Sequence, residues 1–132
     1  MPARRTAHSG SPFEESIGFS RALRVGAVTT VSGTAPVNSD GTSAGIDDVV
    51  AQARRCFQII QAALHDVGVP MHDVIRTRMY LAKASDGEAV GRVHGEFFHD
   101  VRPAATMIVV AGFLRPEWLV EIEADAFSPD LA

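Results

Sequence analysis

The most informative absences in this sequence concern cysteine, long apolar segments and excess positive charge. Cys56 is the only cysteine among the 132 residues, so no internal disulfide can form. The longest apolar run, residues 107–114, is far shorter than the roughly 20 residues that span a membrane. The net charge of −4 lacks the basic excess typical of nucleic-acid binding. We therefore expect a cytoplasmic protein whose partners include neither nucleic acid nor a membrane.

Common cofactor motifs are missing as well. The sequence contains neither G-x-G-x-x-G nor a phosphate-loop pattern. A single cysteine provides no Cys pair for zinc. His94 and His99 are five residues apart, so they do not share one face of a helix. We expect no cofactor and no metal site, whereas a catalytic triad stays open because its members assemble in space rather than in sequence.

The hydrophobic pattern predicts seven regular elements. Six apolar residues within 47–67 recur at helical spacing, and Gly68 and Pro70 end this helix. Residues 73–82 alternate between an apolar and a mixed face, as a strand does. The predicted strands are 18–25, 27–32, 73–82, 104–111 and 118–127, with helices at 47–67 and between residues 85 and 102.

This order, β-β-α-β-α-β-β, indicates an α+β fold with a mixed sheet and two helices packed on one face. Ser85 and Glu88 have the spacing of a capping box, which favours a start of the second helix there. The Thr, Ile and Val residues of 104–111 predict a buried strand. We divide the chain into a flexible N-terminal arm at residues 1–12 and a single domain at residues 13–132.

Two strands leave a mixed face on the side away from the helices. Arg76, Arg78 and Tyr80 lie on one strand, and Glu121 and Glu123 lie on another. Exposed ion pairs on a solvated face would explain this pattern, although they contribute little stability. A subunit interface or cleft that holds a small polar ligand would also explain it. Both explanations stay open at this point.

Several ordered segments resemble the RidA/YjgF-like superfamily, formerly called the endoribonuclease L-PSP family. They are R-P-A-A-T-M at 102–107, L-V-E-I-E-A-D-A at 119–126, V-S-G at 31–33 followed by Pro36, D-V-I-R-T at 73–77 and E-F-F at 96–98. The resemblance implies a chorismate-mutase-like α+β fold. It also implies a homotrimer with ligand clefts between subunits, which would give the mixed sheet face a purpose.

The best-known members of that superfamily hydrolyse enamine and imine intermediates such as 2-aminoacrylate. In them an arginine that follows Pro-Ala grips the substrate carboxylate with both guanidinium arms. Ala105 stands at that position here, as in a subgroup without the arginine. The resemblance implies that Glu121 is the cleft glutamate, that Ser32 and Gly33 contact substrate, and that Phe19 replaces a tyrosine. We expect activity on 2-aminoacrylate or 2-iminobutyrate to be weak or absent.

The predicted site therefore has one catalytic candidate and six substrate-binding candidates. Glu121 would act as a general acid and base, with its pKa raised by partial burial. The substrate-binding candidates are Phe19, Ser32, Gly33, Arg78, Ala105 and Met107. Strand parity makes Arg78 or Arg76 a candidate to supply the missing positive charge, and Arg78 is the first of the two. If the protein is an enzyme, it is a hydrolase or deaminase that acts on imine-type C–N bonds in a small metabolite. A non-catalytic metabolite sensor or chaperone-like trimer is the alternative.

Overall fold

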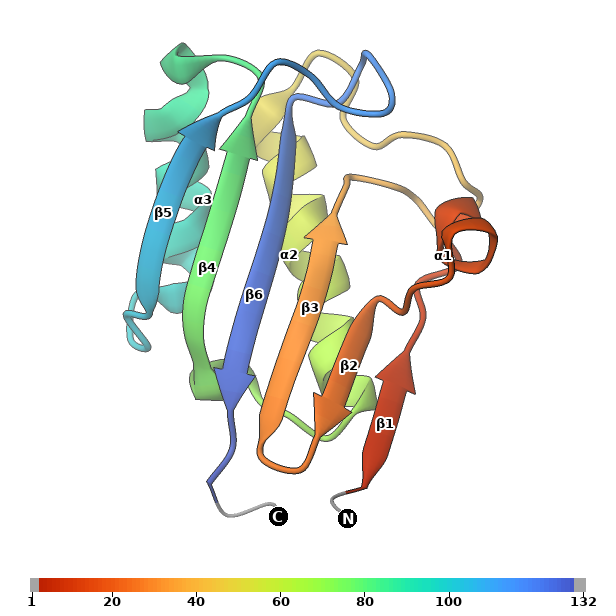
Figure 1. Cartoon of the computed structure of the whole chain (residues 1–132). Helices are drawn as coiled ribbons and strands as arrows, with labels where there is room; N and C mark the ends of the chain where they lie inside the picture. Colours follow the sequence, from red (N-terminus) through yellow and green to blue (C-terminus); the bar gives the residue numbers. More distant parts are fainter. Residues whose placement is uncertain (1–2, 130–132) are drawn as a thin grey trace.

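The computed structural model describes residues 3–129, which form one six-stranded sheet with helices beside it (Figure 1). The strand order is β1-β2-β3-β6-β4-β5. Strands β4 and β5 are parallel, and every other neighbouring pair is antiparallel. The strands are β1 (Arg4–Ala7), β2 (Ala22–Val25), β3 (Val28–Thr34), β4 (Val74–Leu81), β5 (Ala104–Val109) and β6 (Val120–Phe127). The α-helices are α1 (Pro12–Ile17), α2 (Val49–Asp66) and α3 (Gly87–Phe98), and short 3₁₀ turns lie at Met71–Asp73 and Ala84–Asp86.

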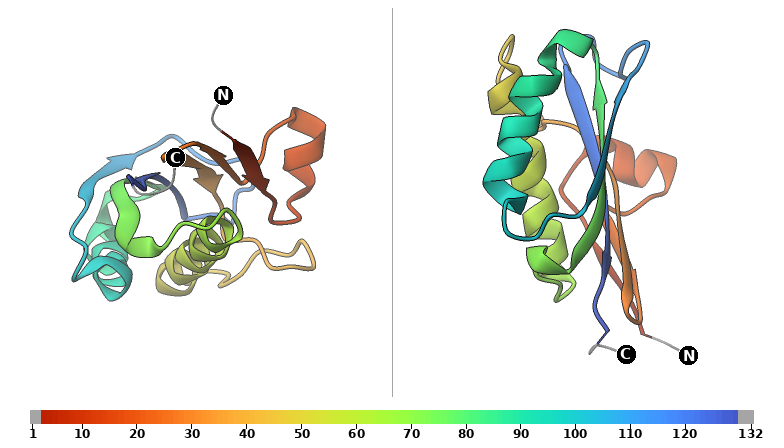
Figure 2. Two further views of the ribbon diagram at one scale, coloured as in Figure 1. Left: turned by 90° about the horizontal axis from the view of Figure 1, so that it is seen from below. Right: turned by 90° about the vertical axis from the view of Figure 1, so that its left-hand side faces the viewer.

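Helices α2 and α3 cover one face of the sheet, and the main core lies between them and the strands (Figure 2). The predicted stripe of α2 is buried there, and the Phe57 ring lies 5.8 Å from the Phe98 ring of α3. Strand β6 alternates, so that Val120 and Ile122 are fully buried while Glu121 lies on the opposite face. The predicted α+β class, mixed sheet and one helical face are confirmed. None of the helices in residues 3–129 is long and apolar enough to cross a membrane.

A buried glutamine ties the start of α2 to the segment that leads into β6. The Gln52 amide donates to the carbonyls of Gly45 (3.2 Å) and Glu117 (3.0 Å), and its oxygen accepts from the Leu119 amide at 2.8 Å. A fully buried amide needs such partners, because an unpaired one costs about 1–3 kcal/mol. These bonds fix the position of Trp118 and the entry to β6, which both contribute to the site described below.

The N-terminal region differs from the expectation of a flexible arm over residues 1–12. Arg4–Ala7 pairs antiparallel with Ala22–Val25 as the edge strand β1, and the apolar side chain of Ala7 is buried. Helix α1 follows, and it stands apart from α2 and α3 at the β1–β2 end of the sheet (Figure 2). Residues 1, 2 and 130–132 of the predicted arm and domain lie outside the described residues.

Two further expectations need correction. Helix α3 begins at Gly87 after the N-cap residue Asp86, whose side chain makes no capping bond, so the predicted capping box of Ser85 and Glu88 does not form. Strand β5 was expected to be buried, yet all six of its residues are exposed in the isolated chain. The physical reason is its position: β5 is an edge strand with β4 as its single neighbour in the sheet.

Candidate functional site

A cavity of about 400 Å³ opens between α1, the end of β3 and the start of β6. Most of its wall is apolar, with side chains of Phe13, Ile17, Phe19, Ile59, Leu114 and Trp118. One end is polar and contains Arg21, Ser32, Gly33, Thr34 and Glu121. A concave site of this size, with an apolar wall and a few polar groups at one end, suits a small organic molecule.

An irregularity in β3 shapes the polar end. The register between β3 and β6 shifts between Val31 and Thr34, which places Ser32 and Gly33 in a bulge. A Cβ atom added at Gly33 would lie 3.0 Å from Oε1 of Glu121. Any other residue at this position would push the carboxyl group aside by a few tenths of an ångström, so glycine favours this close approach. The bulge and the carboxyl group form one unit of the cavity wall.

The Glu121 carboxyl group is in an unusual electrostatic environment. Burial raises its pKa above the ordinary value, Arg21 lowers it, and the neighbouring Glu123 raises it further, with a net upward shift. No group in residues 3–129 makes a hydrogen bond with this carboxyl group. A carboxyl group with a raised pKa is a stronger base than an ordinary one, and its protonated form can return the proton, as a general acid and base must.

Arg21 is the buried cation of the site, and its Nε and NH1 donors are already used within the protein. Its NH1 donates to the carbonyl of Gly33 at 2.6 Å and to Oγ1 of Thr34 at 3.2 Å. Its Nε donates to Oγ of Ser9 at 3.2 Å, and the guanidinium lies over the Phe19 ring at 5.3 Å. Burial lowers the pKa of Arg21, but an arginine stays protonated in proteins. Arg21 thus holds the β3 bulge in place and adds positive charge near Glu121.

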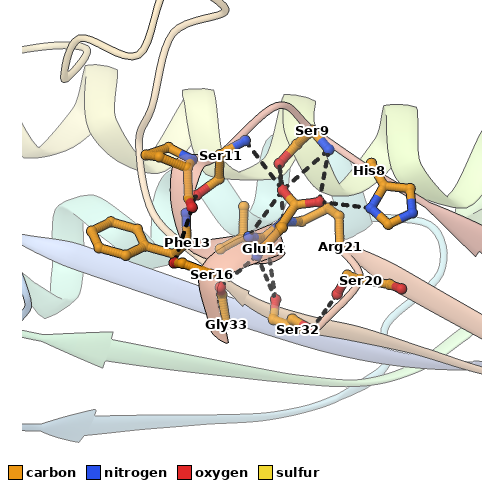
Figure 3. Close-up of polar contacts among 12 residues, drawn as sticks. His8, Ser9, Ser11, Phe13, Glu14, Ser16, Ser20, Arg21, Ser32 and Gly33 are labelled. Carbon is orange, nitrogen blue, oxygen red and sulfur yellow. Dashed lines mark hydrogen bonds and ion pairs between the residues drawn. The ribbon is translucent and has the colours of Figure 1, made fainter. Parts of the chain in front are cut away.

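Glu14 neutralises Arg21 and anchors α1 to the sheet (Figure 3). Its Oε2 lies 3.6 Å from NH2 of Arg21, and both side chains are only 5% exposed. The carboxylate also accepts from Oγ of Ser9 (2.5 Å), from the backbone amides of Ser9 and Ser11, and approaches Nδ1 of His8 at 3.1 Å. Burial alone would raise the pKa of Glu14, but the Ser9 bonds and Arg21 outweigh it and lower the pKa. The network joins the N-terminal segment, α1 and the β3 bulge.

Helix α1 is well defined at both ends, which keeps this wall of the cavity in place. Ser11 is its N-cap, and the Ser11–Glu14 pair forms a complete capping box, with Pro12 at the first helical position. Gly18 ends the helix with a left-handed backbone (φ 92°), which favours glycine. The turn at Gly18 leads directly into Phe19 and Arg21, so the cap sets the position of both residues.

The structure brings together four of the seven predicted site residues. Phe19, Ser32, Gly33 and Glu121 all line the cavity, although they come from the α1–β2 connection, β3 and β6. Their predicted roles toward a substrate stay predictions. Their common position shows that the resemblance pointed to residues that share one cavity.

The other three predicted residues lie on β4 and β5, away from this cavity in the isolated chain. Arg78 lies 3.1 Å from Asp125 and 3.4 Å from Glu123, with its side chain 36% exposed. Ala105 pairs with Thr77 in the β4–β5 register. Met107 packs toward α3, where a Cβ added at Gly91 would lie 3.3 Å from its terminal methyl.

Sequence reasoning missed Arg21 and Glu14 as contributors to the site. A signal for Glu14 was present, because Ser11 and Glu14 have the same S-x-x-E spacing that was read at Ser85 and Glu88. The role of Arg21 has no such signal. Its partners in Ser9, Glu14 and the β3 bulge come together only in the folded chain.

Ser43 is a further residue that sequence reasoning missed. It lies in the segment G-T-S-A-G at 41–45, which has the G-x-S-x-G spacing of a nucleophile elbow. That elbow requires a turn between a strand and a helix, whereas Ser43 lies in an irregular loop. Its hydroxyl donates to Glu117 at 2.9 Å and accepts from Nε1 of Trp118 at 3.0 Å. Ser43 therefore supports the cavity wall at Trp118 and lacks the setting of a nucleophile.

Potential metal ligands do not cluster in the part of the chain that the structure describes. Within residues 3–129 no three His, Cys, Asp or Glu side chains gather as they would around a metal ion. Cys56 is fully buried in the core, and burial raises the pKa of its thiol, as expected of a small apolar core residue.

The sheet, the two helices on one face and the cavity beside the β3 bulge define an α+β domain with a cavity large enough for a small molecule. The family model described as endoribonuclease L-PSP matches residues 11–128. The solved structure of a YjgF/YER057c/UK114 family member from Mycobacterium tuberculosis superposes with a TM-score of 0.85 and 39% identity, covering 95% of this chain and 99% of that one. This chain belongs to the endoribonuclease L-PSP family, within the RidA/YjgF superfamily.

Two sequence relatives extend the comparison. An uncharacterised protein of Streptomyces coelicolor is 41% identical over 123 residues, which cover 93% of this chain and 91% of the relative. The 3-aminoacrylate deaminase RutC of Acinetobacter baylyi is 29% identical over 99 residues, which cover 75% of this chain and 78% of that enzyme. The predicted family and the YjgF-type fold are thus confirmed.

Proposed function

We propose that this chain binds and hydrolyses a small metabolite with an imine-type C–N bond in the cavity beside Glu121. The observation that carries the proposal is the Glu121 carboxyl group itself. It lines a cavity of about 400 Å³, its pKa is raised, and no described residue makes a hydrogen bond with it. The similarity to the 3-aminoacrylate deaminase RutC supports chemistry at a C–N bond.

Glu121 has the chemical capacity that such a hydrolysis requires. The ionised carboxylate takes a proton from water as the water oxygen bonds to the imine carbon. The protonated carboxyl group then delivers a proton to the nitrogen. The hydroxyl proton of the resulting carbinolamine then passes through the carboxylate to the nitrogen as the C–N bond breaks, so that ammonia leaves and a carbonyl compound remains. Each turnover returns Glu121 to its initial state, so the step needs no cofactor.

We further propose that the active form is a homotrimer whose clefts lie between subunits. Strand β5 supports an interface, because all of its residues are exposed and Ile108 and Val109 are apolar. The sheet face away from α2 and α3 supports it too, since ion pairs of Arg78 line it. Light scattering at micromolar concentration should give about three times the monomer mass of 14.1 kDa. A mass near that of the monomer would contradict the trimer.

The position of Ala105 leads us to propose weak activity on small 2-imino acids. A methyl group offers no charged contact to a substrate carboxylate, and such a contact is worth about 3 kcal/mol, or roughly a hundredfold in rate. Ala105→Arg should raise the affinity for small 2-oxo acids. It need not restore full turnover, because the surrounding residues were not selected to hold an arginine.

A coupled assay of imine hydrolysis tests the role of Glu121. Glu121→Gln should lower the rate at least about a hundredfold, within the range that general acid–base catalysis contributes. Glu123→Gln is the matched control, since Glu123 lies two residues away and is engaged by Tyr80 at 2.7 Å. Equal rates for Glu121→Gln and the native trimer would show that the carboxyl group has no catalytic role.

A further inference from the structure

Two charged side chains of this chain, Arg21 and Glu121, line the cavity, and only Arg21 has an ion-pair partner among the described residues. Arg21 donates to Ser9, Gly33 and Thr34 and is neutralised by Glu14. The Ser32 hydroxyl donates to the carbonyl of Ser20 at 2.7 Å. Glu121 has neither an ion-pair nor a hydrogen-bond partner among the described residues. A ligand in the cavity therefore meets, on this chain, one charged group without an ion-pair partner, and that group is a carboxyl group.

This arrangement discriminates between classes of ligand head group. A carboxylate head would lose its hydration, find no cation without an ion-pair partner and face the like charge of ionised Glu121. A head with N–H groups, such as a primary amide or an iminium, would donate to the Glu121 carboxylate, and hydrogen bonds to a charged partner are the stronger kind. The cavity thus favours an uncharged or cationic N–H donor over an anion.

The apolar wall indicates which kind of group is attached to that head group. Phe13, Phe19 and Trp118 contribute aromatic surface, and the rings of Phe13 and Trp118 meet edge to face at 6.3 Å. Leu114 adds an aliphatic side chain at the rim, where it is 72% exposed. A bare three- or four-carbon imino acid would leave most of this surface in contact with water, whereas a flat or branched apolar group would cover it.

We propose that the ligand of this cavity is an N–H-bearing amide or imine on an aromatic or branched apolar group, without a carboxylate. The proposal rests on the function proposed above, because it assumes that the Glu121 cavity is the ligand site. It goes further because it specifies the N–H head group of the ligand, the apolar group attached to it, and the carboxylate that is excluded.

Calorimetric titration of the native protein at pH 7.5 with matched small molecules tests this. Phenylacetamide and phenylacetate have nearly the same shape and differ in the head group, and acetamide lacks the apolar tail. Phenylacetamide should bind at least about tenfold more tightly than either, because each comparison removes one favourable contact worth 1.4 kcal/mol or more. Glu121→Gln should reduce the preference for the amide over the carboxylate, since it removes the negative charge.

Two side-chain truncations check where the tail lies. Leu114→Ala should weaken phenylacetamide several-fold and leave the weak acetamide binding unchanged. Ile75→Ala is the control, because Ile75 is also exposed (56%) but is not part of the cavity wall. Both positions are exposed, so neither truncation should disturb folding.

The possible failures are distinguishable. If phenylacetate or 2-oxobutyrate binds more tightly than phenylacetamide and Glu121→Gln alters that binding, the proposed ligand class is wrong while the cavity remains the ligand site. If none of these compounds binds at millimolar concentration, both the ligand class and the proposed function are overturned. If Leu114→Ala and Ile75→Ala have equal effects on phenylacetamide, the proposed position of the tail is wrong.

Discussion

Two clusters of opposite charges lie in this molecule, and they differ in burial and in what they hold. The Arg21–Glu14 pair at the cavity is 5% exposed on both sides, and its arginine also donates to the backbone of the β3 bulge. The Arg78 cluster on the open sheet face has its three side chains 29–36% exposed, and its partners are the side chains of Glu123 and Asp125. The first cluster connects separate segments of the chain, whereas the second bridges the adjacent strands β4 and β6.

The difference teaches that an arginine near a binding site need not bind the ligand. Arg21 is close to Glu121, but its donors are committed to Ser9, Gly33 and Thr34. Arg78 was the first candidate to replace the missing arginine, yet in the isolated chain its nearest carboxylates are Glu123 and Asp125. We therefore assign Arg21 to the architecture of the cavity and propose Glu121 as the group that meets a ligand.

The largest effect is expected from removing the buried cation. Arg21→Gln should lower the free energy of unfolding by about 3 kcal/mol, because it leaves the buried Glu14 carboxylate without its ion-pair partner and frees the bulge carbonyl of Gly33. Urea denaturation followed by circular dichroism measures this. A loss below about 1 kcal/mol would place Arg21 in the same class as an exposed arginine and would remove the contrast between the clusters.

A smaller effect of opposite sign is expected at Glu121. Its folded-state pKa is raised above the ordinary 4.5, so the folded protein binds this proton more tightly than the unfolded chain does. Stability from Glu121 is therefore lost as the pH rises from 4.5 through the raised pKa. Glu121→Gln has no carboxyl group to ionise at this site, so it should be more stable than the native protein at pH 7. The difference in stability should vanish below pH 4.5. Denaturation at several pH values checks it, and a Glu121→Gln protein that is less stable at pH 7 would contradict it.

The smallest effect is expected on the open sheet face. Arg78→Gln should change the stability of the folded subunit by less than about 1 kcal/mol, since partly exposed ion pairs are screened by solvent. The difference between Arg78→Gln and native protein should shrink further in 0.5 M salt. Measurement at a fixed protein concentration keeps the proposed subunit association constant. An effect as large as that of Arg21→Gln would mean that this face is buried more deeply than the single chain shows.

Much of the fold was predictable because its elements carry strong periodic signals. The α2 stripe ended by Gly68 and Pro70, and the alternation in β4 and β6, gave the order from β2 to β6 correctly. The N-terminal part was harder. Arg4–Ala7 has no alternating pattern, and it becomes a strand because β2 offers it an unpaired edge. The exposure of β5 was also unpredictable, since an apolar edge strand has the same composition as a core strand.

The site was partly predictable for a different reason. Phe19, Ser32, Gly33 and Glu121 were identified through a family resemblance, and the fold brings them to one cavity. Arg21 was not identified, because its role depends on Glu14 and on a bulge that no local pattern indicates. Strand parity correctly placed Arg78 on the face of Glu121, but parity says nothing about which neighbouring carboxylates would engage it.

Amide ¹H–¹⁵N spectra recorded during a titration with phenylacetamide, and separately with 2-oxobutyrate, test the central claim most directly. The claim is that a ligand meets Glu121 in the cavity beside the β3 bulge. We expect the amide signals of Gly33, Thr34 and Glu121 to shift in a saturable manner, and we expect Glu121→Gln to reduce these shifts. Saturable shifts confined to Arg78, Tyr80 and Glu123, with the signals of Gly33 and Thr34 unchanged, would contradict it and place the ligand on the open face of the sheet.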